Sequence, residues 1–117
     1  MIEEISADGL QALLDEDAPV RIVDIRAPGA FSRGHIPGSE CTPFARLTQE
    51  IDAFDDDTHV VTVCPHGQAS KQAARLIDSY EGFSGTVQSL KAGYQGWEQE
   101  YEVRSDMDDR AGSDRPF

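Results

Sequence analysis

The chain has 117 residues, of which 38% are apolar and 27% charged, which is typical of one globular domain and too short for two. Ten basic residues against 22 acidic ones give a formal net charge of −12, which disfavours binding to nucleic acids or anionic membranes. No apolar stretch approaches the ~18 residues of a membrane span, and the start of the chain has no basic and hydrophobic leader, so we expect a cytoplasmic protein.

Apolar spacing and breaker residues divide the chain into alternating helices and strands. In chain order, the sequence predicts a short lead over 1–5, a helix from the N-cap Ser6 to Leu14, a buried strand over 20–25, a loop over 26–40, a helix over 43–54, a strand over 59–64, a loop over 65–69, a helix over 70–80, a strand over 86–90 and a helix over 93–101. This alternation predicts an α/β fold with a central, mainly parallel sheet flanked by helices.

The end of the chain differs in composition from the rest. From Ser105 onward it is made mostly of Asp, Arg, Gly, Ser and Pro. We therefore predict a folded domain over residues 1–104 and an acidic, disordered tail over 105–117.

The strand that ends at Cys64 is followed by a tight loop and then by a helix. Ligand sites in parallel sheets lie beyond the carboxyl ends of the strands. A loop that curls around a thiol can point its backbone N–H groups inward, and the helix N-terminus adds further donors. Both favour the thiolate, so the sequence predicts a lowered pKa for the Cys64 thiol and a site for an anionic substrate.

Pro65 has no N–H group, so the donors around Cys64 must come from residues 66–70, where Gly67 allows a tight curl. None of the side chains in residues 65–69 is a fixed cation. The alternative interpretation is a buried cysteine at the end of a strand, followed by an ordinary turn.

Three motifs, in this order and spacing, resemble signatures of the rhodanese family, most closely its small single-domain thiosulfate sulfurtransferases. The resemblance covers about residues 5–101. The motifs are Asp24-Ile25-Arg26 with Phe31 and Gly34-His35-Ile36-Pro37-Gly38, then Cys64-Pro65-His66-Gly67-Gln68-Ala69-Ser70-Lys71, and finally Leu90-Lys91-Ala92-Gly93 with Trp97.

The resemblance implies a rhodanese-like fold and a sulfurtransferase without metal or cofactor. Cys64 would take the outer sulfur of thiosulfate or a persulfide donor, hold it as a persulfide, and pass it to a thiol, cyanide or a protein acceptor. The residues expected to bind substrate, through loop backbone or nearby side chains, are His66, Gly67, Gln68, Ala69, Ser70 and Lys71.

The sequence departs from the family pattern at two places. Many relatives carry an Arg at or next to the position of Ala69, and Ala92 replaces the first glycine of the last signature. We expect the first change to weaken selectivity for a dianionic donor and the second to cause a small local adjustment. Phosphatases of the Cys-x5-Arg type are disfavoured because Ser70 stands where their Arg would be.

The remaining candidates are interpreted as structural. Asp24 and Arg26 alternate with Ile25 and are expected to form an ion pair, and the ring of His35 is expected to bond to loop backbone. Cys41 is interpreted as a small loop or core residue, with a disulfide to Cys64 as the alternative. The His and Cys residues lack the spacing of a metal site.

Two broader questions stay open at this point. With 13 Asp and 9 Glu among the acids, and eight Arg but only two Lys, the composition is typical of proteins that work at very high salt, although an ordinary acidic protein is the alternative. We expect a monomer. The rival functions are a sulfur-relay module with little thiosulfate activity and a catalytically silent regulatory domain.

Overall fold

Five parallel strands form one sheet in the order β1-β5-β4-β2-β3. The strands are β1 (Glu3–Ile5), β2 (Arg21–Asp24), β3 (Glu40–Cys41), β4 (His59–Val63) and β5 (Thr86–Leu90). The computed structural model describes residues 2–105. Its parallel sheet and flanking helices confirm the α/β prediction.

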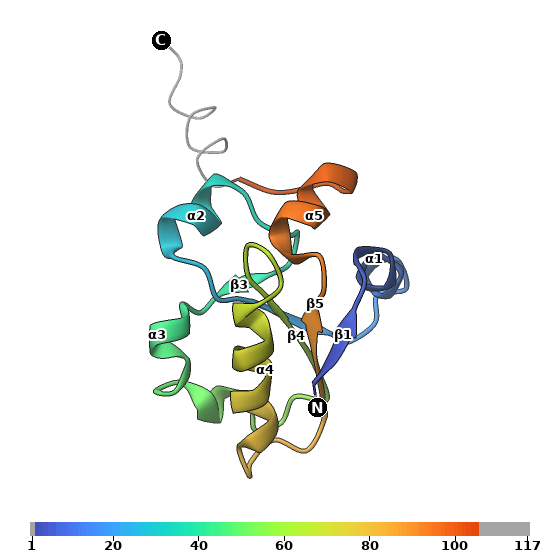
Figure 1. The fold of residues 1–117 in the computed structure, drawn as a ribbon. Coiled ribbons are helices and arrows are strands. Elements are labelled where there is room, and N and C mark those ends of the chain that lie inside the picture. Colours follow the sequence, from blue (N-terminus) through green and yellow to red (C-terminus); the bar gives the residue numbers. More distant parts are fainter. Residues whose placement is uncertain (1, 106–117) are drawn as a thin grey trace.

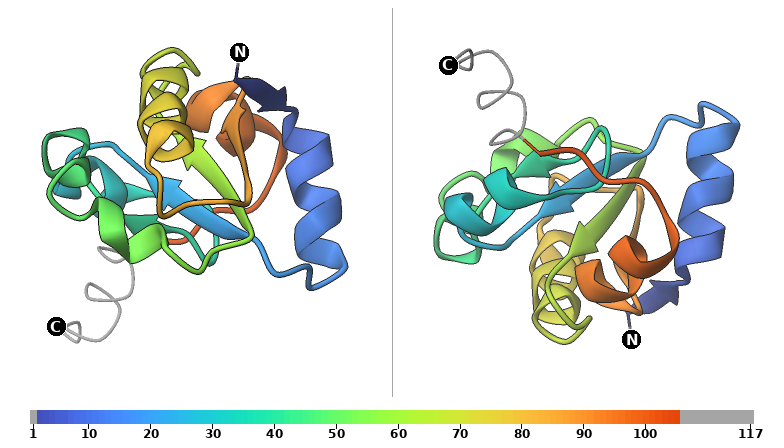
Figure 2. Two further views of the ribbon diagram at one scale, coloured as in Figure 1. Left: turned by 90° about the horizontal axis from the view of Figure 1, so that it is seen from below. Right: turned by 90° about the horizontal axis from the view of Figure 1, so that it is seen from above.

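Helices cover both faces of the sheet (Figure 1, Figure 2). The helical elements are α1 (Ala7–Asp15), α2 (Pro28–Arg33), α3 (Phe44–Leu47), a 3-10 helix (Ile51–Phe54), α4 (Ala69–Ser79) and α5 (Gly93–Glu100). None of the helices in the described part of the chain is long and apolar enough to cross a membrane.

Alternate side chains of the central strand β4 enter two separate cores. Val60 packs with α4 residues such as Ala74 and Ile77 on one face. Val61 packs with Leu10 of α1 and Trp97 of α5 on the other face. Successive strand side chains point to opposite faces, so the valines of a strand such as β4 can be buried on both sides.

The N-terminal lead is a strand, which the sequence reading did not predict. Glu3–Ile5 pairs in parallel with Gln88–Leu90 of β5 and forms one edge of the sheet. The segment is only three residues long, and its burial pattern is exposed, exposed, intermediate. Such a short segment gives little periodicity, and its pairing with a strand more than 80 residues later along the chain decides its structure.

The predicted loop over 26–40 was also wrong in part, because it contains α2 and the first residue of β3. Pro28 stands in the first turn of α2, where its missing N–H costs nothing. The predicted helix over 43–54 is instead two short turns, α3 and the 3-10 helix. Both turns bury an apolar residue, Leu47 and Phe54, so two separate turns gave the apolar spacing expected of one helix.

The carboxyl end of β4 leads into the loop that begins at Cys64, which Figure 1 shows between α2 and α5. Strands β5 and β2 flank β4 on its two sides. The loop therefore emerges from the middle of the sheet. The tail predicted for residues 105–117 lies, apart from Ser105, outside the described residues.

Candidate active site

The sulfur of Cys64 lies inside the loop that follows β4. The Gly67 N–H donates a hydrogen bond to Sγ at 3.0 Å, and the Ser70 hydroxyl oxygen lies 3.3 Å from Sγ. Cys64 is 2% exposed, while Pro65 and His66 beside it are exposed. The loop therefore covers the sulfur and directs hydrogen-bond donors toward it from the inside of the loop.

Two opposing effects set the acidity of the Cys64 thiol. Burial alone would raise its pKa, since it disfavours the charged thiolate. The Ser70 hydroxyl, and the backbone N–H groups of Ser70, Gly67 and His66, all stabilise the thiolate by hydrogen bonding. The hydrogen bonds outweigh the burial, and the pKa of Cys64 is lowered from the ordinary thiol value.

The start of α5 holds the loop in place. The N–H of Tyr94 donates to the carbonyl of Cys64 at 2.8 Å, and the N–H of Gln95 donates to the carbonyl of Pro65 at 3.1 Å. Residues at a helix N-terminus have such free N–H groups. The backbone N–H groups in the first turn of α5, which have no partner within the helix, thus hold Cys64 and Pro65 in position.

Two glycines make this contact possible. Gly67 and Gly93 have φ values of 90° and 68°, in the left-handed region that favours glycine. A Cβ at Gly93 would lie 2.5 Å from the carbonyl oxygen of Pro65 and 2.7 Å from the nitrogen of Gly67. The last sequence motif therefore works as a contact surface for the Cys64 loop.

Ala92, which replaces the first glycine of that motif, is accommodated without strain. Its φ of −80° and ψ of −10° are right-handed values that any residue adopts. The backbone at this position does not require glycine, so the substitution leaves the neighbouring Gly93 contact in place.

Buried hydroxyl groups lie below the sulfur. The Ser70 hydroxyl is 2.6 Å from that of Ser89 on β5, and the Thr62 hydroxyl donates to the Ser70 carbonyl at 2.7 Å. All three side chains are fully buried. They tie the first turn of α4 to strands β4 and β5 next to the Cys64 sulfur.

The remaining predicted loop residues do not contact the sulfur through their side chains. Gln68 is the N-cap residue of α4 and is exposed, and Ala69 begins that helix. The Lys71 ammonium lies 3.4 Å from the Glu4 carboxylate of β1, so its charge is directed toward the edge of the sheet. Lys71 is thus paired with a carboxylate of β1 and does not point its charge at the sulfur.

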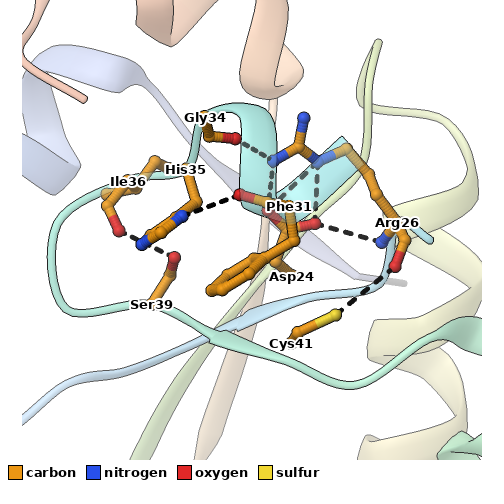
Figure 3. Close-up of polar contacts among 8 residues, drawn as sticks. All are labelled: Asp24, Arg26, Phe31, Gly34, His35, Ile36, Ser39 and Cys41. Atoms are coloured by element: carbon orange, nitrogen blue, oxygen red, sulfur yellow. Dashed lines mark hydrogen bonds and ion pairs between the residues drawn. The ribbon is translucent and has the colours of Figure 1, made fainter. Parts of the chain in front are cut away.

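Asp24 and Arg26 form a buried, two-pronged ion pair next to the site (Figure 3). Arg26 Nε donates to Oδ1 at 2.9 Å, and one terminal nitrogen, Nη2, donates to Oδ2 at 2.8 Å and to the carbonyl of Gly34 at 2.6 Å. The guanidinium also lies 3.9 Å from the ring centroid of Tyr94. This cluster connects the end of β2 to the helix that holds the Cys64 loop.

His35 supports the same segment from the side. Its ring stacks on Phe31 with centroids 3.9 Å apart, and Nδ1 lies 2.8 Å from the Phe31 carbonyl oxygen (Figure 3). The residue is buried. These contacts fold the end of α2 toward Gly34 and the ion pair.

Cys41 is separated from Cys64 by a whole strand. Asp24 of β2 pairs with Cys41 on one side and with Val63 on the other. Neighbouring strands lie about 4.8 Å apart, so the two cysteine Cα atoms are roughly 10 Å apart, beyond the ~7 Å limit for a disulfide. Burial and the Asp24 carboxylate raise the pKa of Cys41, which makes it a poor nucleophile.

The sequence reading missed the roles of Ser89 and Tyr94. A serine in a strand that ends near the active-site loop was a usable signal, since a buried hydroxyl needs a partner. Tyr94 contributes through its backbone, which no side-chain pattern reveals. Among residues 2–105, no three His, Cys, Asp or Glu side chains gather as a metal ion would require.

Comparison with known proteins agrees with this architecture. The chain is 37% identical over 89 residues to the thiosulfate sulfurtransferase GlpE of Pseudoalteromonas translucida, covering 76% of this chain and 82% of that protein. A GlpE of Pseudomonas fluorescens Pf-5 is 37% identical over 99 residues, with coverage of 85% and 87%. The human single-domain sulfurtransferase TSTD1 shares the fold, with a TM-score of 0.74 and 23% identity over 87% of this chain and all of that one. The family model of the rhodanese-like domain matches residues 6–100, and the chain belongs to this family.

Proposed function

We propose that the chain is a sulfurtransferase that carries a sulfane sulfur as a persulfide on Cys64. The observation that carries this proposal is the set of donors aimed at one sulfur atom: the Gly67 N–H, the Ser70 hydroxyl and further loop N–H groups. The family and the GlpE relatives, named thiosulfate sulfurtransferases, support it.

The first half-reaction loads the enzyme. The Cys64 thiolate attacks the outer sulfur of thiosulfate, a new S–S bond forms, and the bond to the sulfonate sulfur breaks. Sulfite leaves with the electron pair of that bond, and the negative charge moves to the outer sulfur of the Cys64 persulfide. The loop N–H groups, which stabilise the thiolate, lie where they can also stabilise this anion.

The second half-reaction empties the enzyme. An acceptor thiolate attacks the outer sulfur of the persulfide, the S–S bond to Cys64 breaks, and Cys64 leaves as a thiolate. The outer sulfur is transferred without its bonding electrons, so no external oxidant or reductant is needed. The lowered pKa of Cys64 makes its thiolate a good leaving group in this step.

Access to the sulfur comes from the exposed side of the loop. Cys64 itself is 2% exposed, but the side chains of Pro65, His66 and Gln68 around it are exposed, so a donor approaches the sulfur from this side. The inner side of the loop is fixed by Gly67, Gly93 and the first turn of α5.

The test is incubation with thiosulfate followed by mass spectrometry of the intact protein. We expect a mass increase of one sulfur atom that a reducing thiol removes, in wild type and in Cys41→Ala but not in Cys64→Ala. Cys41→Ala is the matched control, because it removes the other cysteine of the chain. An adduct that persists in Cys64→Ala, or none in wild type with any sulfane donor, contradicts the proposal.

A sulfur-relay module with little thiosulfate activity is the second candidate, and the lack of a fixed cation within the loop itself is the observation that favours it. Residues 65–69 carry no fixed cation, and Lys71 is paired with Glu4. A protein persulfide donor needs no cation for a sulfonate group. Loading of Cys64 by a cysteine persulfide on a protein, with slow loading by thiosulfate, would identify this second function.

A further inference from the structure

A surface pocket of about 410 Å³ lies next to the active-site loop and is not used by the mechanism above. Its walls come from α2 and α5, and Pro65, the residue after Cys64, forms part of its lining. The other lining residues are Arg26, Ala30, Arg33, Gly34, Tyr94, Gln95 and Glu98.

Arg26 gives the pocket a built-in hydrogen-bond donor. Its side chain is only 8% exposed and is held rigidly by Asp24 and Gly34. Figure 3 shows its other terminal nitrogen, Nη1, pointing away from both of these groups. Within the described part of the chain, this nitrogen has no hydrogen-bond acceptor, although Arg26 lines the pocket.

Two opposite charges on the pocket wall are also unpaired. Arg33 on α2 and Glu98 on α5 form no ion pair with any of the residues 2–105. Both residues are exposed and line the pocket, so neither charge is committed to a partner among these residues. The carboxylate of Glu98 and the guanidinium of Arg26 both act on Tyr94, which places both kinds of charge at one pocket.

These groups fit a ligand that carries a carboxylate and an ammonium group together. Arg33 and Nη1 of Arg26 offer donors to the carboxylate, and Glu98 and the Gln95 amide offer acceptors to the ammonium. A small dianion such as thiosulfate would gain from the arginines but would face Glu98. The pocket therefore suits an amino acid better than a sulfur oxyanion.

We propose that this pocket, beside the Cys64 loop, binds the acceptor of the second half-reaction, and that the acceptor is a low-molecular-weight thiol of the α-amino-acid type, such as cysteine. The inference rests on the proposed function. The transfer is balanced: the acceptor thiolate bonds to the outer persulfide sulfur, the S–S bond breaks, and Cys64 departs as a thiolate. Arg33 and Glu98 act as specificity-determining residues.

Turnover with three acceptor thiols tests the charge recognition. Cysteine carries both groups, cysteamine only the ammonium and mercaptoacetate only the carboxylate. For each variant, the value of kcat/KM with a thiol is divided by its value of kcat/KM with cyanide. This quotient is then divided by the same quotient of the wild type, so that the intrinsic reactivity of each thiol cancels from the final ratio. The matched controls are Arg75→Gln on α4 and Glu100→Gln on α5, two exposed residues outside the pocket.

We expect Arg33→Gln to lower the ratio about threefold or more for cysteine and mercaptoacetate but not for cysteamine. Glu98→Gln should lower it for cysteine and cysteamine and raise it for mercaptoacetate. Equal changes for all three thiols, or the same changes in the control variants, would overturn the proposal. A gain for cysteine in Glu98→Gln would show a plain anion site and would also overturn it.

A binding measurement separates this inference from the proposed function. S-methylcysteine has both charged groups but no thiol, so it binds without reacting. Titrated into Cys64→Ala at millimolar concentration, it should shift the backbone amide NMR signals of Gly34 and Gln95, and Glu98→Gln should weaken this effect. Absence of these shifts rejects the pocket even if Cys64 accepts sulfur, and their presence supports it even if thiosulfate fails to load Cys64.

Discussion

The Ser89 hydroxyl lies 2.6 Å from the Ser70 hydroxyl, which in turn lies 3.3 Å from the Cys64 sulfur. Both serines are fully buried, so water cannot replace a missing partner. If Cys64 is a thiol, the three groups carry three hydrogens but make only two contacts with one another, so one hydrogen has no acceptor within this row. With a thiolate there are two hydrogens for two contacts, and each is satisfied.

Ser89→Ala is therefore expected to raise the pKa of Cys64, because Ser70 loses the donor that polarises its own hydroxyl. The rise should be smaller than in Ser70→Ala, which removes the direct bond from the hydroxyl to the sulfur. The rate of Cys64 alkylation by iodoacetamide, followed against pH in Cys41→Ala, gives both values. The half-maximal rate moves to higher pH in each variant, since a smaller thiolate fraction remains at any given pH.

Ser79→Ala is the control for this pair, because its hydroxyl donates to the Leu76 carbonyl on an exposed part of α4. It should leave the pH profile of alkylation unchanged. An unchanged profile in Ser89→Ala would show that the second hydroxyl of the row has no influence on the sulfur.

Gly93 and Gly38 offer a matched comparison of two left-handed glycines. Both have positive φ values, 68° and 86°, but a Cβ at Gly93 would collide with the active-site loop, whereas one at Gly38 meets nothing within 4 Å. Gly38→Ala should cost about 1 kcal/mol of unfolding free energy and leave persulfide formation intact. Gly93→Ala should cost more and slow persulfide formation at least tenfold, because Pro65 and Gly67 must move. If Gly93→Ala and Gly38→Ala lose the same unfolding free energy and the same rate of persulfide formation, the contact between Gly93 and the Cys64 loop is not needed for loading.

The Asp24–Arg26 pair should matter far more for stability than a surface pair of the same charges. Arg26→Gln leaves the fully buried Asp24 carboxylate without its partner, at a cost of about 3–5 kcal/mol of unfolding free energy. Arg46→Gln breaks the exposed pair with Glu50, which is worth no more than about 0.5 kcal/mol. Urea unfolding at neutral pH measures both. Similar costs for the two variants would show that the buried network is not needed for the fold.

The central strands and the long helix were predictable because local and tertiary preferences agree there. β4 is rich in valine, and both cores bury its valines, while α4 has its apolar side chains on one helical face. The elements that the sequence reading missed are short and depend on distant partners. β1 exists because it pairs with β5, and β3 contributes only two paired residues.

The candidate site divides in the same way. Cys64 and its loop could be identified from sequence, because a nucleophile between a strand and a helix leaves a local pattern. The supports came from elsewhere in the chain: Ser89 from β5 and the Tyr94 N–H from α5. A backbone donor has no residue signature, and the serine of β5 indicates a buried polar contact in the sequence but not which group it contacts. Only the packing of distant elements on the loop reveals these contacts.

The net charge of −12 gives a last prediction about anionic reagents. The loop residues 65–69 hold no fixed cation, so the long-range field of the protein should slow the approach of an anion to Cys64 at low salt. Screening shortens the range of this field from about 30 Å at ~0.01 M salt to about 3 Å at ~1 M. In Cys41→Ala, the alkylation rate of Cys64 by iodoacetate, divided by that with the uncharged iodoacetamide, should therefore rise several-fold with salt, and the KM for thiosulfate should fall. The same ratio for a small free thiol provides the control. A ratio that falls with salt would mean that local cations, such as Arg26 and Arg33 of the pocket that Pro65 also lines, outweigh the field of the whole chain at the sulfur.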